Sequence, residues 1–286
     1  MHSVTVLAVG GTGESHPDDH RTHVTGLLRG VADALDDRFV CIWVGYPASY
    51  GPVAAGGLSY RHSTEVGVRR LITEIEATEG PLMLIGYSQG CTVIREVLGR
   101  VAESRILIPD LIAVGLISDP EQPEDVVRGC QGRGVAGVGP AVPSALPMHW
   151  IADPRDMICN ASDDSYVRDI ADLTRWMSLR ARRTWFRELW KLLRSNSFQN
   201  SAKTRLSPKQ WPKDVSRLRT ALHEIRGYLP PHLTWCGIRV SNSLGGRHIA
   251  YATEPLDSGG RTGCQVLAEW MQVQATYRQP AAPLAA

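Results

Sequence analysis

LMLIGYSQG, at residues 82–90, decides the fold of this 286-residue chain. The apolar run Leu82–Ile85 predicts a buried strand, and the residues from Cys91 to Leu98 have helical character. The G-x-S-x-G pattern between them predicts a sharp strand-to-helix turn that pushes the serine outward, while the glycines leave room for the backbone. Ser88 is therefore the candidate nucleophile of an acyl-transfer enzyme.

The same alternation of short apolar runs with helix-period segments continues along the chain and predicts an α/β fold, a parallel sheet flanked by helices. The predicted strands are Val4–Gly10, Phe39–Val44, Leu82–Gly86, Leu111–Ile117 and Met148–Ile151. The predicted helices of this part of the chain are Thr22–Leu35, Ser63–Thr78 and Gln89–Val101.

After Ser162 the sequence no longer alternates between short apolar runs and helices, and mainly helices are predicted. Ser162-Asp163-Asp164 fits a helix cap, and a helical stretch is expected from there to about Leu193. A second helix near Asp214–Tyr228, an apolar run over Leu233–Val240 and a final helix at Gly263–Val273 complete the prediction.

Charge separates this region from the rest. Tyr166–Trp235 holds 15 Lys/Arg and 5 Asp/Glu, a balance of +10, and five of the eight tryptophans, whereas the remaining residues balance to −8. We therefore predict a hydrolase core over residues 1–165 and 236–275, a helical specificity insertion over 166–235, and a disordered tail over 276–286.

Composition limits the other function classes. A hydrophobic share of 43% and a charged share of 21% are typical of a globular protein, and no apolar run approaches the length of a membrane span. The six cysteines form no C-x-x-C pair, so neither a zinc site nor a disulfide framework is expected. The N-terminus lacks the features of a signal peptide, which predicts synthesis in the cytoplasm.

A serine nucleophile needs a general base, and the base needs a carboxylate that orients it. With this kind of turn, the chain order is serine, acid, histidine. Asp153 and Asp156 both follow the predicted strand Met148–Ile151, and either could be the acid. His248, just before the last predicted helix, is the expected base.

The other histidines have simpler interpretations. His223 falls inside a predicted helix, and His232 lies between prolines and an apolar run. His16, His20 and His23 form a loose cluster in which His20 and His23 could share a helix, but no carboxylate completes a ligand set. We therefore expect no metal, and a serine-based reaction needs no cofactor.

An oxyanion hole needs two backbone donors. The N–H of Gln89 is one candidate, and Thr12 (or Gly11) in the loop after the first predicted strand is the other. This loop, Gly10–Gly13, lacks the G-K-[ST] of a phosphate-binding loop and the spacing of G-x-G-x-x-G, so nucleotide binding is not expected.

Taken together, these motifs resemble the cutinase-like serine esterases of the α/β-hydrolase superfamily, and among them the lysin B enzymes of mycobacteriophages. The Gly-Gly-Thr-Gly loop is similar to their oxyanion loop, Gly86–Gly90 to their nucleophile turn, and His248–Tyr251 to their H-x-x-Y. Asp156–Cys159 resembles the D-x-x-C around the catalytic acid, which favours Asp156 over Asp153. Ala152 stands where cutinases have the partner cysteine, so a free Cys159 is expected.

The resemblance implies the triad Ser88, Asp156 and His248, and a helical insertion between acid and base as in lysin B enzymes. It also implies a phage lysis enzyme that hydrolyses the ester between mycolic acids and arabinogalactan, in contact with the lipid surface of the host envelope and with no nucleic-acid partner. Two alternatives are a general carboxylesterase of the cutinase or lipase type and a non-catalytic envelope-binding protein.

Overall fold

The computed structural model describes residues 3–51, 57–163, 165–175, 177, 187, 190, 211–235 and 238–277. Most of the predicted helical stretch beyond Arg175 and the tail beyond Tyr277 lie outside these residues, as do the side chains of Trp176, Trp185, Trp211 and Trp235.

Five parallel strands form one sheet in the order β2-β1-β3-β4-β5. They are β1 (Val4–Val9), β2 (Phe39–Trp43), β3 (Leu82–Tyr87), β4 (Leu111–Ile117) and β5 (Met148–Ile151), each within one residue of the predicted bounds. Because the strands are parallel, their carboxyl ends gather at one edge of the sheet, where the loops that carry functional residues begin.

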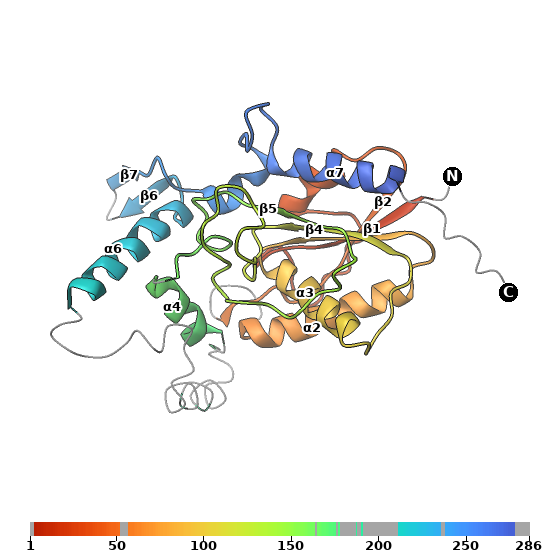
Figure 1. Ribbon diagram of the computed structural model, residues 1–286, viewed down its shortest axis with the longest axis horizontal. Helices are drawn as coiled ribbons and strands as arrows, with labels where there is room; N and C mark the ends of the chain where they lie inside the picture. Colours follow the sequence, from red (N-terminus) through yellow and green to blue (C-terminus); the bar gives the residue numbers. More distant parts are fainter. Residues whose placement is uncertain are drawn as a thin grey trace.

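Helices cover both faces of this sheet (Figure 1). One face packs on α2 (Tyr60–Glu76) and α3 (Gln89–Ala102), and the other on η1 (Gly26–Leu28), α1 (Arg29–Ala32) and α7 (Gly263–Tyr277). Side chains of β1 alternate between two cores, because successive residues of a strand point to opposite faces. The arrangement is the predicted α/β-hydrolase fold.

The predicted helix Thr22–Leu35 is wrong over much of its length, since only Gly26–Ala32 is helical. Gly26 has a φ of +61°, a left-handed backbone that begins the short helical segment and separates it from the preceding loop. His20 and His23 therefore lie in that loop, and the prediction that they share a helix is also wrong.

The predicted insertion contains α4 (Tyr166–Thr174), α6 (Trp211–Tyr228) and β6 (His232–Trp235). Strand β6 pairs antiparallel with β7 (Ile238–Ser241), which lies beyond the predicted end of the insertion. The predicted apolar run is thus two antiparallel strands. The cap of α4 is Ser165, whose Oγ accepts from the N–H of Val167, and the predicted cap at Ser162 is wrong.

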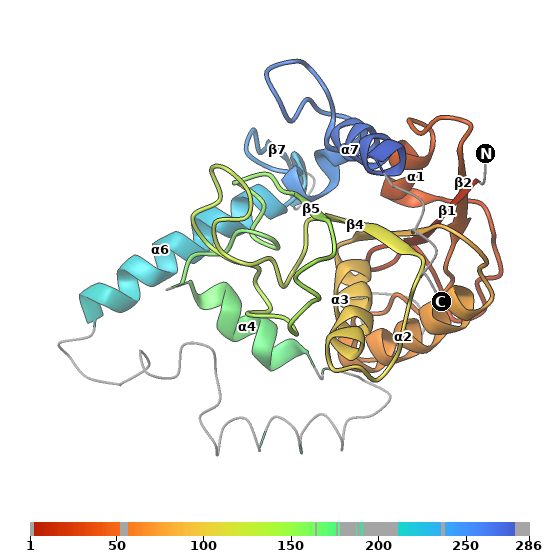
Figure 2. The same ribbon diagram turned by 45° about the vertical axis from the view of Figure 1, so that its right-hand side comes forward.

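Figure 2 shows α4 and α6 beside the carboxyl edge of the sheet. Val167 and Ala221 are buried between the two helices, and Arg217 pairs with Asp169 at 3.2 Å. Trp190, from the same predicted insertion, is 67% exposed. Among the described helices, none has both the length and the apolar character needed to cross a membrane.

The turn that carries Ser88 depends on two close backbone approaches. Ser88 has φ +51° and ψ −118°, and a Cβ added to Gly90 would lie 2.0 Å from the carbonyl oxygen of Val9. A Cβ at Gly86 would lie 3.0 Å from the backbone nitrogen of Cys91. The start of α3 therefore sits against β1 only if residue 90 is glycine.

We expect Gly90→Ala to lower the free energy of unfolding by about 3 kcal/mol, because the new methyl group has to displace backbone rather than a mobile side chain. Urea unfolding followed by circular dichroism measures this. Ala102→Ser, at the exposed end of α3, is the control and should stay within about 0.5 kcal/mol of the wild type. Equal stability of the two variants would contradict the packing described for Gly90.

Candidate active site

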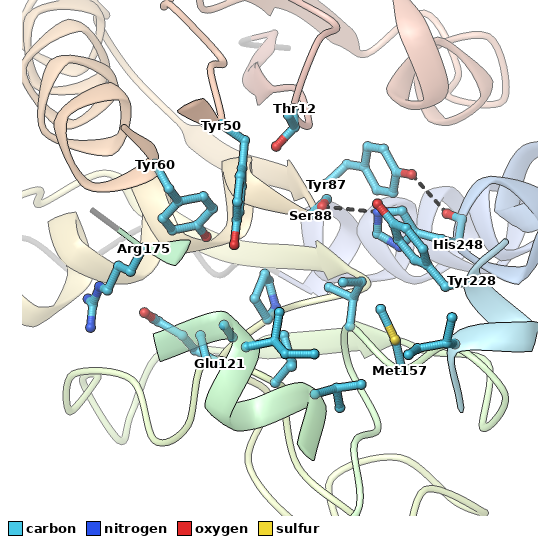
Figure 3. A pocket seen from close by; sticks show the side chains of 18 of the residues that line it. Thr12, Tyr50, Tyr60, Tyr87, Ser88, Glu121, Met157, Arg175, Tyr228 and His248 are labelled. Atoms are coloured by element: carbon cyan, nitrogen blue, oxygen red, sulfur yellow. Dashed lines mark hydrogen bonds between the residues drawn. The ribbon is translucent and has the colours of Figure 1, made fainter. Parts of the chain in front are cut away.

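Ser88 lies in the turn between β3 and α3, at the carboxyl edge of the sheet. The strained backbone directs its side chain away from the sheet into a cavity (Figure 3). Its Oγ lies 3.1 Å from Nε2 of His248. The serine predicted from the G-x-S-x-G pattern therefore contacts the predicted histidine, although 160 positions separate them.

The other ring nitrogen of His248 lies 3.0 Å from Oδ2 of Asp156. Because an ionised carboxylate only accepts hydrogen bonds, Nδ1 carries the proton and Nε2 is the acceptor that faces Ser88. This assigned tautomer is the one that a general base for a serine requires. The structure thus brings Ser88, His248 and Asp156 into one hydrogen-bonded row.

Asp156 has no exposed surface, yet four donors surround it. Its Oδ2 accepts from the hydroxyl of Ser118 at 2.6 Å and from that of Tyr251 at 2.9 Å, besides His248, and its Oδ1 accepts from the N–H of Ile158 at 3.1 Å. Burial alone would raise the pKa of Asp156, but the charge of His248 and these hydrogen bonds bring that pKa below its usual value. Asp156 therefore stays ionised beside the imidazole.

Asp153, the alternative acid, has a different partner. Its two carboxylate oxygens accept from Nε and Nη2 of Arg155, at 2.9 and 2.7 Å, and Oδ1 also accepts from the backbone N–H of that arginine. Arg155 therefore pairs with Asp153, and it does not take the carboxylate that faces His248.

Ser118 is a part of the site that the sequence did not predict. It follows β4, is fully buried, has a φ of +52°, and lies 3.0 Å from Nδ1 of His248 as well as beside Asp156. Its place directly after a buried strand, at the same sheet edge as Ser88, was the one available signal.

Two aromatic rings from different parts of the chain contact the imidazole of His248. The ring of Tyr87 stacks on it at 5.1 Å between centroids, and its hydroxyl donates to the backbone carbonyl of His248 at 2.8 Å. The ring of Tyr228, from α6, lies 5.3 Å from the imidazole. The predicted insertion thus contacts the candidate base directly.

The loop Gly10–Gly13 lies beside Ser88, and the backbone N–H groups of Gly11 and Thr12 differ in their hydrogen-bond partners. The N–H of Gly11 donates to Oε2 of Glu14 at 2.7 Å, so Gly11 is excluded as an oxyanion donor. Within the described chain, no acceptor contacts the N–H of Thr12, and the hydroxyl of Thr12 donates to the side chain of Gln89 at 3.1 Å. Gln89 begins α3, where an N–H has no acceptor within the helix.

Thr12 and Ser88 line a cavity of about 650 Å³. The core of the protein contributes one wall, and α4 and α6 contribute another. The apolar residues that line this cavity are Pro120, Val135, Ala136, Met157, Ile158, Val167, Ile170, Ala171, Ile225 and Ile249. A long hydrocarbon group would find an apolar environment there.

The remaining histidine candidates do not join the site. His16, His20 and His23 are exposed in their loop, and His223 and His232 are exposed in the predicted insertion. Among the residues that the structure describes, no three His, Cys, Asp or Glu side chains are placed to hold a metal ion. Cys159 is a free, buried thiol near Tyr251.

Residues 40–144 match the model of the PE-PPE domain family. The matched segment contains Ser88 and Ser118 but neither Asp156 nor His248. No curated protein matches the chain.

Solved structures that resemble this one include esterases. The catalytic core domain of acetyl xylan esterase from Trichoderma reesei is 19% identical, with 61% of this chain and 96% of that chain covered and a TM-score of 0.43. A cutinase-like protein from Cryptococcus sp. is 17% identical, with 55% and 79% covered and a TM-score of 0.41.

The two candidate acids can be separated by substitution. We expect Asp156→Asn to lower kcat about 10³- to 10⁴-fold, because an amide at this place favours the wrong imidazole tautomer. Asp153→Asn is the matched variant and should change kcat less than about threefold, since its partner Arg155 is 53% exposed. Hydrolysis of a short nitrophenyl ester measures both, and a larger loss for Asp153→Asn would reverse the assignment.

Ser118→Ala should lower kcat about tenfold with little change in KM, because Asp156 loses one charge-assisted hydrogen bond but keeps three donors. Ser118→Thr, which retains the hydroxyl, should restore part of the activity if the added methyl fits. A kcat equal to that of the wild type in Ser118→Ala would show that this hydrogen bond has no role in positioning the acid.

Proposed function

We propose that this protein is a serine esterase of the cutinase-like type, which hydrolyses carboxylic esters of a long apolar acyl group. The continuous row of hydrogen bonds from Ser88 through His248 to Asp156, at the edge of an apolar cavity, carries the proposal. The esterase names among the similar structures agree with it.

The geometry suits a two-step acyl transfer. Ser88 attacks the ester carbonyl while Nε2 of His248 takes its proton, and Asp156 stabilises the imidazolium that forms. The N–H groups of Gln89 and Thr12 receive the oxyanion. The protonated histidine then gives its proton to the leaving alcohol, and a water molecule deprotonated by the same histidine releases the acid from Ser88.

The hydrogen bond between Thr12 and Gln89 supports this assignment of donors. It links the loop after β1 to the residue after the nucleophile, so that both amides stay beside Ser88. The Gln89 amide group also donates to the carbonyl of Ser49, at 3.1 Å, which fixes a third segment around the same point. A preorganised pair of donors costs no rearrangement when charge develops.

The resemblance to lysin B enzymes extends the proposal to a substrate, the ester between mycolic acids and arabinogalactan, cleaved during phage lysis. Two observations support it. The helices α4 and α6, which lie between acid and base in the sequence, form a wall of the cavity, and most of the residues that they contribute to it are apolar. Residues 166–235, which include these helices, have a net charge of +10 against −8 for the rest of the chain, and this suits contact with an envelope surface.

The experiment measures hydrolysis of a short soluble ester and release of free mycolic acids from purified mycolyl-arabinogalactan-peptidoglycan, with wild type and Ser88→Ala. The variant should lose at least about 10³-fold in kcat on both substrates, because it removes the hydroxyl that Nε2 of His248 contacts. Ser162→Ala, an exposed serine outside the site, is the control and should keep full activity.

The two substrates test different parts of the proposal. Wild-type rates in Ser88→Ala would contradict the nucleophile. Hydrolysis of the soluble ester without release of mycolic acids would support a general cutinase or lipase and reject the envelope substrate.

A further inference from the structure

The cavity has a second polar end that the triad does not use. Figure 3 shows Ser88 and His248 on one side of the cavity and Glu121, Tyr60 and Arg175 on the other, with apolar side chains between them. Polar groups at a distance from the reacting atoms do not take part in the chemistry, but they can select the substrate that fills the cavity.

Glu121 is the least satisfied of these groups. Only 4% of its surface is exposed, and its Oε2 has no hydrogen-bond partner within the described part of the chain. That oxygen faces Nε of Arg95, which lies 3.9 Å away and therefore beyond hydrogen-bond distance. Burial and the neighbouring Asp119 raise the pKa of Glu121 to about 8, so its carboxyl group is mostly neutral at pH 7.

Arg175 follows the last residue of α4 and is half-buried at the edge of the cavity. Its guanidinium contacts no acceptor among the described residues, and its charge acts on Glu121. An arginine side chain has five N–H donors and is usually paired when it loses water. A ligand atom that accepts hydrogen bonds would satisfy it here.

Two tyrosines complete this end of the cavity. The rings of Tyr50 and Tyr60 lie edge to face at 5.2 Å. Each hydroxyl is fixed by a threonine, Tyr50 by Thr174 at 2.6 Å and Tyr60 by Thr92 at 2.7 Å. An oxygen fixed in this way still has a free position for a further hydrogen bond.

We propose that Glu121, Arg175 and the two tyrosines form a subsite for a hydroxyl group of the substrate, at the end of the cavity remote from Ser88. This inference rests on the proposed esterase function. A hydroxyl both donates and accepts, so it can satisfy the guanidinium and the carboxyl group together. A carboxylate ligand only accepts hydrogen bonds, so it cannot donate to the Glu121 carboxyl group as a hydroxyl can, and a bare hydrocarbon end would leave the polar groups unpaired.

Such a hydroxyl can come from two parts of an ester. It can be carried by the acyl chain at some distance from the carbonyl, or by a sugar that forms the alcohol. The first is tested with nitrophenyl esters of linear acids and of their terminally hydroxylated counterparts, over a series of chain lengths. The second is tested with one acyl chain esterified either to glucose or to methanol.

For one pair of esters that differ in the hydroxyl group, we expect the wild type to prefer the hydroxylated ester at least about tenfold in kcat/KM. The reason is that a site built for a hydroxyl rejects an analogue that lacks it. Glu121→Gln and Arg175→Met should each reduce that preference to less than about threefold. Arg175→Met protects the test against misfolding, because this side chain holds no other described group. Arg69→Met, exposed on α2, is the matched control and should keep the preference.

Binding is measured separately, by calorimetry with Ser88→Ala and the methyl esters of the plain, hydroxylated and terminally carboxylated acids, together with the glucose ester. A hydroxyl preference in binding without turnover by the wild type would support the subsite and reject the esterase function. Hydrolysis of plain esters with no hydroxyl preference at any chain length, or tighter binding of the carboxylated acid, would overturn the subsite and leave the esterase function intact.

Discussion

The fully buried carboxylate of Asp156 is the group on which the rest of the site depends. An ionised carboxylate without partners costs several kcal/mol in a protein interior, so it is stable there only where donors surround it. Its donors come from the end of β4, from its own loop and from the segment η5 (Arg247–Ala252). The charge therefore joins parts of the chain that are far apart in sequence, and it orients the imidazole at the same time.

The loop that carries His248 is tied to the end of α6. The N–H of Gly246 donates to the carbonyl of Leu229 at 2.8 Å, and the side chain of Asn242 donates to the carbonyl of Arg226 at 2.7 Å. Because the same helix places Tyr228 on the imidazole and Ile225 in the lining of the cavity, α6 contributes both to the position of the candidate base and to the shape of the cavity. A shift of α6 would change both together.

Local patterns predicted those parts of the structure that depend on neighbouring residues. The five strands were predicted within one residue, because each is a short apolar run between polar segments. The helix Thr22–Leu35 was predicted wrongly. Its apolar spacing does not show the left-handed backbone of Gly26, nor the hydrogen bond from the N–H of Leu27 to the carboxylate of Glu14. Ser118 belongs to no recognised sequence motif. It is identified as part of the site only because the end of β4 meets the loop of Asp156 and η5 in the folded structure.

The choice between Asp153 and Asp156 also needed long-range geometry. Both carboxylates follow β5, and the resemblance to cutinases favoured Asp156. What separates them is that Arg155 pairs with Asp153, whereas Asp156 contacts His248. The helix α4 adds a constraint of the same kind: its middle residues form the apolar wall of the cavity, and its end places Thr174 on Tyr50 and Arg175 near Glu121. One helix therefore contributes both to the apolar wall and to the polar end of the cavity. The residues of α4 at the cavity are thus on a different element from Ser88, and none of them donates a hydrogen bond to Asp156.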